Sequence, residues 1–248
     1  MNYDDSRVQR FGEGFQGEVV TFGTGPGADF QALWVKAGEG IGSNFRVLGP
    51  NLDADFSLPI PGRHNVLNAL AAIAVASEFD VPPVEIRRAL AGFQSIPQRG
   101  EYFTLPGPVT IINDSYNSNP QAMECMLETL RTWPGARRRI VVAGEMLELG
   151  PQSPKLHEEV GRKCAEADLA WLIAVQGDAR YFLAGAVAAG LPPARSRFFL
   201  DARLAAEFCR AQLEPGDVVL VKGSRGVHLE TAAEMLRESR VESQESRS

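Results

Sequence analysis

The second half of the chain, from Glu101, alternates five times between a short apolar run and a segment of helical character. The runs that predict strands are Val109–Ile112, Ile140–Ala143, Trp171–Val175, Arg197–Leu200 and Val218–Val221. The segments that predict helices are Gln121–Thr132, Ser153–Ala165, Ala179–Ala188, Ala202–Gln212 and His228–Glu238. Strands that alternate with helices pair in parallel, because each helix carries the chain back across the sheet. The pattern therefore predicts an α/β fold, with a Rossmann-like, mostly parallel sheet and helices on both faces.

Residues 1–62 have a different character, since glycine-rich turns separate short β-like runs. The predicted strands here are Glu18–Phe22, Phe30–Lys36, Asn44–Leu48 and Ala54–Ile60, and the predicted helices that follow are His64–Glu78 and Val81–Phe93. Gln94–Gly100 has the composition of a domain junction. We therefore expect one domain over residues 1–97, a second over 98–240, and a polar, disordered tail over 241–248.

Capping residues support the predicted helices of the second domain. Side chains that can accept a hydrogen bond from a helix N-terminus stand before or at the start of four of them, at Asn119, Ser153, Asp178 and Asp201. We expect all four to act as N-caps.

Charge and composition exclude several classes of protein. The net charge of −6 argues against a nucleic-acid partner, since phosphate binding needs a basic surface. No apolar run reaches the roughly 20 residues that span a bilayer, and the start of the chain lacks the apolar region of a secretory signal. Three widely spaced cysteines suggest neither a disulfide framework nor a metal site. We expect a cytoplasmic monomer without nucleic-acid or membrane partners and without a metal of its own.

Three loops that follow predicted strands carry polar residues where open α/β sheets bind ligands. They are INDSYNSNP (residues 112–120), Gly144–Gly150 and Lys222–Arg225. In the third loop a glycine and a serine lie between two cations, which suits an anion because backbone N–H groups add to the charges. Taken singly, these loops are also consistent with a well-capped turn or a solvated basic loop. We expect them to meet at one edge of the sheet and to form one ligand site.

The predicted helix His64–Glu78 is apolar nearly all round except near its start, which carries His64, Asn65 and Asn68. Residues three and four apart share a helix face, so these side chains form one polar patch. Burying such groups unpaired costs about 1–3 kcal/mol each. The patch therefore either bonds within the helix start or holds a ligand.

Two glycine clusters near the start of the chain resemble binding motifs. Gly12, Gly14 and Gly17 match G-x-G-x-x-G, but a charged segment precedes them and a strand-like run follows, so we predict a loop and not a dinucleotide site. The run 23–27, GTGPG, predicts a turn.

Four motifs, taken in order, resemble those of a known family. They are HNVLNALAA from His64, INDSYNSNP from Ile112, AGEMLELG from Ala143 with LHEEVG after it, and VLVKGSRG from Val219. These motifs are similar to those of the Mur ligases, most closely of the branch that adds D-alanyl-D-alanine to UDP-N-acetylmuramoyl-tripeptide in peptidoglycan synthesis. The resemblance covers nearly the whole chain. It implies an ATP-dependent ligase that forms a peptide bond through an acyl phosphate, with roles in cell shape and cell division.

The resemblance also implies a role for individual residues. The family has a UDP-substrate domain, a central ATPase domain and a C-terminal Rossmann-like domain, and residues 1–97 correspond to the later part of the central one. Asn65 and Asn68 correspond to asparagines that contact adenine, Arg99 to a hinge arginine that reaches the phosphates, and Asp114 to the aspartate that holds the ribose. The positions that correspond to the substrate cleft are His64, Tyr116, Asn117, Asn119, Lys222, Ser224 and Arg225.

The sequence departs from the family at several points. Asn113 and Glu145 stand where this branch usually has aspartate. The phosphate-binding loop of the family requires Gly-Lys, and no lysine of this sequence follows a glycine. The Mg²⁺ ligands and carbamoylated lysine of the family are also not found. We therefore expect a C-terminal portion of a ligase, with no catalytic residues of its own and not competent alone.

Two other functions remain open at the level of the sequence. One is a stand-alone, non-catalytic module that binds nucleotide or dipeptide. The other is a generic Rossmann enzyme, which the missing glycine fingerprint after the first strand of the second domain disfavours.

Overall fold

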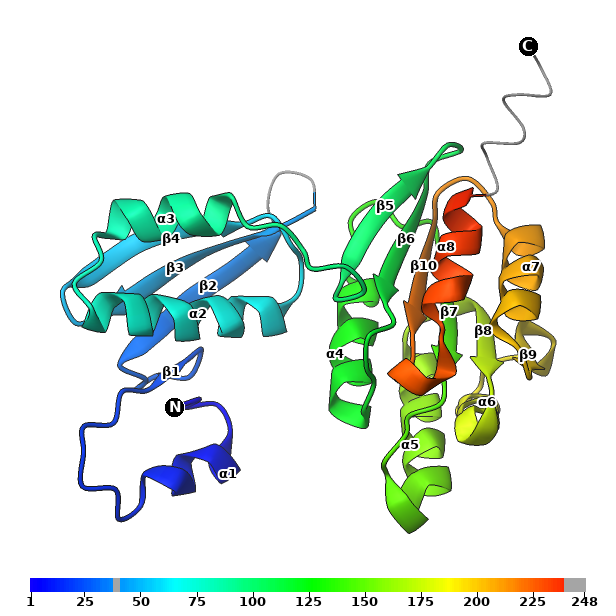
Figure 1. Cartoon of the computed structure of the whole chain (residues 1–248), viewed down its shortest axis with the longest axis horizontal. Helices are drawn as coiled ribbons and strands as arrows, with labels where there is room; N and C mark the ends of the chain where they lie inside the picture. The colour runs from blue at the N-terminus through cyan, green and yellow to red at the C-terminus, as the bar shows by residue number, and fades with distance from the viewer. Residues whose placement is uncertain (38–40, 239–248) are drawn as a thin grey trace. The chain divides into compact units, whose positions relative to one another are not determined.

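The computed structural model describes residues 1–37 and 41–238 and divides the chain into two compact units, Met1–Gln94 and Ser95–Ser248 (Figure 1). The predicted tail, residues 241–248, lies outside the described residues. None of the helices in the described ranges is long and apolar enough to cross a membrane.

The first unit is a small sheet with two helices packed on it. The sheet has the order β1-β2-β3-β4, with bounds Phe22–Gly23, Phe30–Ala37, Ser43–Gly49 and Leu52–Leu58. β1 pairs with β2 in parallel, and the other neighbours are antiparallel. Helices α2 (Arg63–Glu78) and α3 (Pro83–Ala91) bury Leu70, Ile73 and Ile86 against Phe45 and Phe56 of the sheet. This core fixes α2 and α3 on the sheet of the first unit.

The strand predicted at Glu18–Phe22 is wrong, because regular pairing begins only at Phe22. There the start of the chain lies beside β1: the N–H of Tyr3 donates to Phe22 O at 2.8 Å, and the N–H of Phe22 donates to Met1 O at 2.9 Å. A short helix that the sequence did not predict, α1 (Ser6–Gln9), follows and is capped by Asp5. The G-x-G-x-x-G match begins at the last residue of a 3-10 turn, Arg10–Gly12, and continues in the connection to β1, with no strand leading into it.

The second unit is a six-stranded sheet of order β5-β6-β10-β7-β8-β9. In chain order the strands are β5 (Glu101–Leu105), β6 (Val109–Asp114), β7 (Arg138–Gly144), β8 (Leu169–Val175), β9 (Ser196–Phe199) and β10 (Asp217–Lys222). All neighbours pair in parallel except β5, which is antiparallel to β6 and was not predicted. The predicted α/β fold with a mostly parallel sheet is confirmed.

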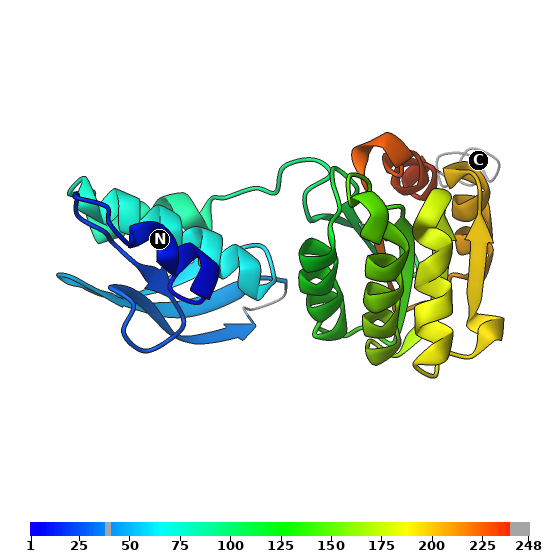
Figure 2. The same cartoon turned by 90° about the horizontal axis from the view of Figure 1, so that it is seen from below.

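Helices cover both faces of this sheet (Figure 2). On one face, α7 (Ala202–Gln212) and α8 (Glu230–Glu238) pack against apolar strand residues such as Ile111, Val142 and Val219. On the other, α4 (Pro120–Arg131), α5 (Ser153–Glu166) and α6 (Arg180–Ala188) lie side by side. Strands buried on both faces are apolar throughout, as IVVA of β7 and VVLV of β10 are.

Two of the four predicted N-caps are confirmed. The side chain of Asn119 accepts the N–H of Ala122 at 2.8 Å, and that of Asp201 accepts the N–H of Arg203 at 2.6 Å. Ser153 is instead the first residue of α5, because a 3-10 turn over Gly150–Gln152 leads directly into that helix. Asp178 lies inside a similar turn before α6, whose N-cap is Ala179.

Candidate functional site

The polar loops of the second unit meet at one edge of the sheet because β10 lies between β6 and β7. In the parallel register, Lys222 is level with Asp114 on one side and with Ala143 on the other. The strands therefore end together, and the loops that follow them, which carry the three polar motifs, start from adjacent positions. This is the carboxyl edge, where open α/β sheets bind ligands.

Lys222 is buried beneath this edge, with 2% of its side chain exposed. Its ammonium donates to Asp114 Oδ2 at 2.6 Å and to the carbonyl oxygen of Asn117 at 2.9 Å. Lys222 was expected to face the substrate cleft, but its side chain is buried and points to Asp114 and Asn117. The ammonium group of Lys222 instead links β10 to the end of β6 and to the loop that follows β6.

The acidic end of β6 remains partly accessible. The side chain of Asp114 is 18% exposed, and Lys222 occupies only one of its two oxygens with a hydrogen bond. The neighbouring Asn113 is buried and accepts the hydroxyl of Ser115 at 2.7 Å. Asp114 is therefore the residue at this strand end with an acceptor left for a ligand.

Ser224 joins the three loops. Its hydroxyl accepts the N–H of Leu147 at 2.9 Å and donates to Ser118 O at 3.3 Å, while its own N–H donates to Glu145 O at 3.1 Å. Ser224 is itself buried. The hydroxyl oxygen of Ser118, also buried, has no hydrogen-bond partner in the part of the chain that the structure describes. Ser224 therefore cross-bridges the three loops of the carboxyl edge, and the Ser118 hydroxyl is left without a hydrogen bond among the described residues.

Glu145 connects the loop after β7 to the turn that follows β8. Its carboxylate accepts the N–H of Asp178 at 2.9 Å, at the turn that leads into α6. At Gly177 φ is +44°, which favours glycine, and a Cβ there would lie 2.0 Å from the Glu145 carboxylate and displace it. Glu145 therefore has a structural partner in the second unit.

His157 holds the same loop and was not singled out from the sequence, although it lies in the LHEEVG motif. It is fully buried on α5, where its Nε2 accepts the N–H of Met146 at 2.9 Å. Its Nδ1 therefore carries the proton and donates to Ser153 O at 2.7 Å. Burial lowers the pKa of His157, outweighing the hydrogen bond to Ser153 and the nearby carboxylates that raise it. The neutral ring is the form that can accept from Met146.

We expect this histidine to make the second unit less stable in mild acid. Because the pKa of His157 is lower in the folded than in the unfolded chain, the unfolded chain takes up the proton first as pH falls below about 6.5. The stabilisation is complete above that value and declines below it. Urea unfolding at several pH values from about 7.5 to 5.5 measures the decline. His157→Gln should flatten the profile, whereas His228→Gln, at an exposed histidine, should keep it; equal slopes in both variants would contradict the assignment.

The aromatic ring of Tyr116 lies close to two arginines. The guanidinium carbon of Arg99 lies 4.0 Å from the centre of its ring and that of Arg225 lies 5.5 Å away. Both arginines are exposed, and neither has an ion-pair partner within the described ranges. Two guanidinium groups near one ring, without carboxylates to neutralise them, form a site suited to an anion.

Asn117 and Asn119 are exposed but make local hydrogen bonds. The side-chain oxygen of Asn117 accepts the N–H of Ser118 at 2.8 Å, and that of Asn119 caps α4. Their amide groups retain N–H donors at the surface of the loop.

The polar patch of α2 belongs to the first unit. His64 and Asn65 are half-buried and Asn68 is exposed. The amide of Asn65 donates to Pro61 O at 2.7 Å, which satisfies one of its donors within the helix start. The amide of Asn68 makes no hydrogen bond with any residue that the structure describes. Asn65 therefore bonds within the helix start, which is one of the two alternatives for the patch, and a ligand at the exposed amide of Asn68 stays a prediction.

No group of three or more histidine, cysteine, aspartate or glutamate side chains within residues 1–37 and 41–238 is placed to hold a metal ion. Two of the three cysteines, Cys164 and Cys209, are buried, and burial raises the pKa of each thiol to about 12. They are packing residues.

Comparison with known proteins gives two family matches. Residues 98–225 match the Mur ligase, glutamate ligase domain, and residues 1–76 match the Mur ligase middle domain. Among curated relatives, the UDP-N-acetylmuramoyl-tripeptide–D-alanyl-D-alanine ligase of Bacillus subtilis is 30% identical over 222 residues, which are 90% of this chain and 48% of the relative. The chain thus spans about half the length of the curated relatives it matches.

Solved structures give the same similarity. MurF from Acinetobacter baumannii superposes with a TM-score of 0.82 at 28% identity, covering 96% of this chain and 51% of that one. MurF from Thermotoga maritima, solved in complex with ADP, superposes with a TM-score of 0.78 at 24% identity, covering 94% and 51%.

Proposed function

Because the chain belongs to the Mur ligase family, we propose that it serves an ATP-dependent ligase that adds D-alanyl-D-alanine to UDP-N-acetylmuramoyl-tripeptide. Within that ligase its two units supply contacts to adenosine and the dipeptide-binding domain. The relatives named for this activity, and the ADP bound to the Thermotoga maritima structure, support the proposal. By the same proposal the protein acts as a cytoplasmic monomer in peptidoglycan synthesis, and so in cell shape and division.

ATP transfers a phosphoryl group to the tripeptide carboxylate, which leaves ADP and an acyl phosphate. The amine of the dipeptide then attacks the acyl carbon, and the C–O bond to phosphate breaks with release of phosphate and a proton. This chain's part is to bind and orient. Asp114, half of whose carboxylate is free, accepts the ribose hydroxyls, and Lys222 holds it in place. Asn68, with Asn65 beside it, presents amide groups to adenine.

The two arginines near Tyr116 each bind a different anionic group of the substrates. Arg99 pairs with the nucleotide phosphates, and Arg225 with the carboxylate of the incoming dipeptide. Ser224 fixes the loop that carries Arg225, while Asn117 and Asn119 offer donors beside it. The observation that carries the proposal is this cross-bridged carboxyl edge, where Asp114 keeps one carboxylate oxygen free and the ring of Tyr116, two residues further on, lies close to two guanidinium groups.

The ribose assignment is tested by replacing Asp114. Asp114→Ala is a poor variant, because it would leave the buried ammonium of Lys222 without its counter-ion. Asp114→Asn keeps an oxygen for Lys222 but removes the charge, and we expect it to weaken ADP binding about tenfold. Calorimetric titration of ADP into the 248-residue chain measures this. Asp168→Asn, at an exposed aspartate before β8 on the opposite sheet edge, is the matched control; unchanged ADP affinity in Asp114→Asn would refute the assignment.

A further inference from the structure

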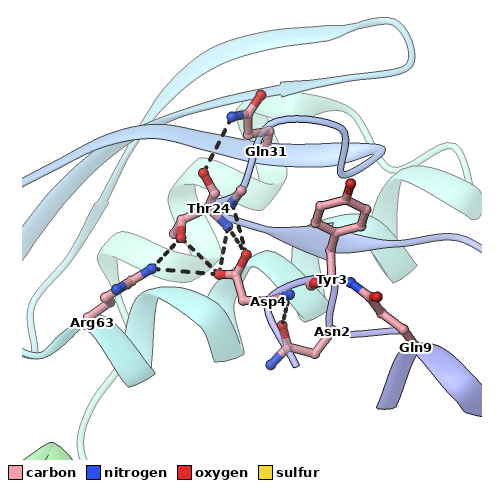
Figure 3. A network of polar contacts seen from close by, with 8 residues as sticks. Asn2, Tyr3, Asp4, Gln9, Thr24, Gln31 and Arg63 are labelled. Carbon is pink, nitrogen blue, oxygen red and sulfur yellow. Dashed lines mark hydrogen bonds and ion pairs between the residues drawn. The ribbon is translucent and has the colours of Figure 1, made fainter. Parts of the chain in front are cut away.

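The first unit contains a polar network around Asp4, Thr24 and Arg63, none of which belongs to the candidate site described above (Figure 3). Its centre is the carboxylate of Asp4, near the start of the chain. Asp4 accepts the N–H of Thr24 at 2.9 Å, the hydroxyl of Thr24 at 2.8 Å and the N–H of Gly25 at 2.9 Å. Burial alone would raise the pKa of Asp4, but these hydrogen bonds and the charge of Arg63 outweigh it and lower the pKa. Asp4 is therefore held as a carboxylate by the turn after β1.

The glycine-rich turn over residues 23–27 has a shape that fits Asp4 and Tyr3. A Cβ at Gly23 would lie 2.7 Å from the Asp4 carboxylate. A Cβ at Gly27, where φ is +107°, would lie 2.8 Å from the Tyr3 hydroxyl. The turn predicted from GTGPG is thus present, and its glycines allow the start of the chain to approach the backbone closely.

The network reaches the first turn of α2 through Arg63, the first residue of that helix. Its guanidinium donates to the hydroxyl oxygen of Thr24 and lies 3.7 Å from Asp4 Oδ2. The Thr24 hydroxyl therefore joins the two charged groups: it donates to Asp4 and accepts from Arg63. Gln31 of β2 also contacts this turn, donating to Thr24 O at 3.4 Å.

The start of α2 needs such support. Its N-cap is Gly62, with φ of 104°, and no side chain caps the helix. No acidic residue lies in its first turn, which instead begins with a cation at the positive end of the helix dipole. Asp4 supplies a negative charge near the start of α2, and its hydrogen bond with Thr24 holds this charge close to Arg63.

We propose that Thr24 and Asp4 are positioning residues that fix the first turn of α2, and with it the patch of His64, Asn65 and Asn68. They act through Arg63 and touch no ligand. The step from this positioning to adenine rests on the function proposed above for Asn65 and Asn68. The network itself, and its effect on the helix start, depend only on contacts within the first unit.

The test compares Thr24→Val with Thr24→Ser in the 248-residue chain. Valine has the shape of threonine but cannot join Asp4 to Arg63, whereas serine keeps the hydroxyl. The first measurement is amide hydrogen exchange at Asn65 and Val66, whose N–H groups both donate to Gly62 O, with Ile86 of α3 as internal reference. We expect exchange about fivefold faster in Thr24→Val and within about twofold of the original in Thr24→Ser. Arg63→Gln replaces the guanidinium that contacts Thr24 and Asp4 with a shorter, uncharged side chain. It should speed exchange about as much as Thr24→Val does.

ADP affinity is the second measurement, taken on the same variants and on Asn68→Ala. We expect a three- to tenfold loss, on the order of one hydrogen bond, in Thr24→Val and in Asn68→Ala, and none in Thr24→Ser. Equal exchange in the valine and serine variants would overturn the positioning role. Faster exchange in Thr24→Val with ADP affinity unchanged there and in Asn68→Ala would support the positioning role and refute the adenine assignment.

Discussion

Replacing Lys222 with methionine is expected to lower the free energy of unfolding of the second unit by about 3–5 kcal/mol. The substitution replaces the four-carbon stem of lysine with an apolar chain of the same length, but it removes the ammonium that donates to Asp114 at 2.6 Å. Asp114 is mostly buried, so its carboxylate would lose its counter-ion where water cannot fully replace it. The carbonyl of Asn117 would lose its donor as well. Urea unfolding followed by circular dichroism measures the loss.

A matched control separates burial from charge. Lys163 forms an ion pair with Glu166 at 3.0 Å on the same unit, but both side chains are at least half exposed. Lys163→Met should therefore lower the free energy of unfolding far less than Lys222→Met does, because water already screens this exposed pair. The double variant Lys222→Met with Asp114→Leu should recover much of the lost stability, because it removes both charges. A similar loss at Lys222 and Lys163 would show that the Lys222 pair is no stronger than a surface one.

Lys222 also shows what the sequence could and could not predict at the site. The strand–helix alternation predicts that VVLV is a strand and that KGSR follows it, and the three loops do meet at one edge. The position of β10 between β6 and β7 is a property of the topology, which the local pattern does not contain. Because lysine is usually exposed, the sequence suggests a solvated or ligand-facing charge, whereas the neighbouring strands bury this one.

The first unit shows the same limit for shorter stretches. GEVVTF has the composition of a strand, but only its last residue, Phe22, belongs to β1, where it pairs with β2 and with the start of the chain. The contacts of Asp4 with Thr24 and of Thr24 with Arg63 span 20 and 39 residues. Periodicity and capping rules act over one or two helical turns, so they predict α2 itself but not what holds its first turn.

Adding a single methyl group at Gly185 is expected to destabilise the second unit by about 3 kcal/mol, at the upper end for overpacking. Gly185 lies on α6, and a Cβ there would be 1.9 Å from the backbone oxygen of Glu158 on α5. The reciprocal contact is as close, since a Cβ at Gly161 of α5 would be 2.2 Å from Phe182 O. Backbone atoms cannot turn aside as a side chain can, so the two helices must separate. The better helix propensity of alanine, worth about 1 kcal/mol, offsets only part of this.

Moving α5 and α6 apart should also disturb the loop after β7 at the carboxyl edge of the sheet. This effect distinguishes the variant from an ordinary loss of packing. His157 of α5 packs against Phe182 of α6 with ring centres 4.7 Å apart, and His157 accepts the N–H of Met146. Gly185→Ala should therefore speed amide exchange at Met146 as well as lower the free energy of unfolding in urea. Ala184→Ser adds one atom at the adjacent, exposed position of α6 and should change stability by no more than about 0.5 kcal/mol. If Met146 exchanges no faster in Gly185→Ala once the loss of global stability is subtracted, α5 and α6 do not position the loop after β7.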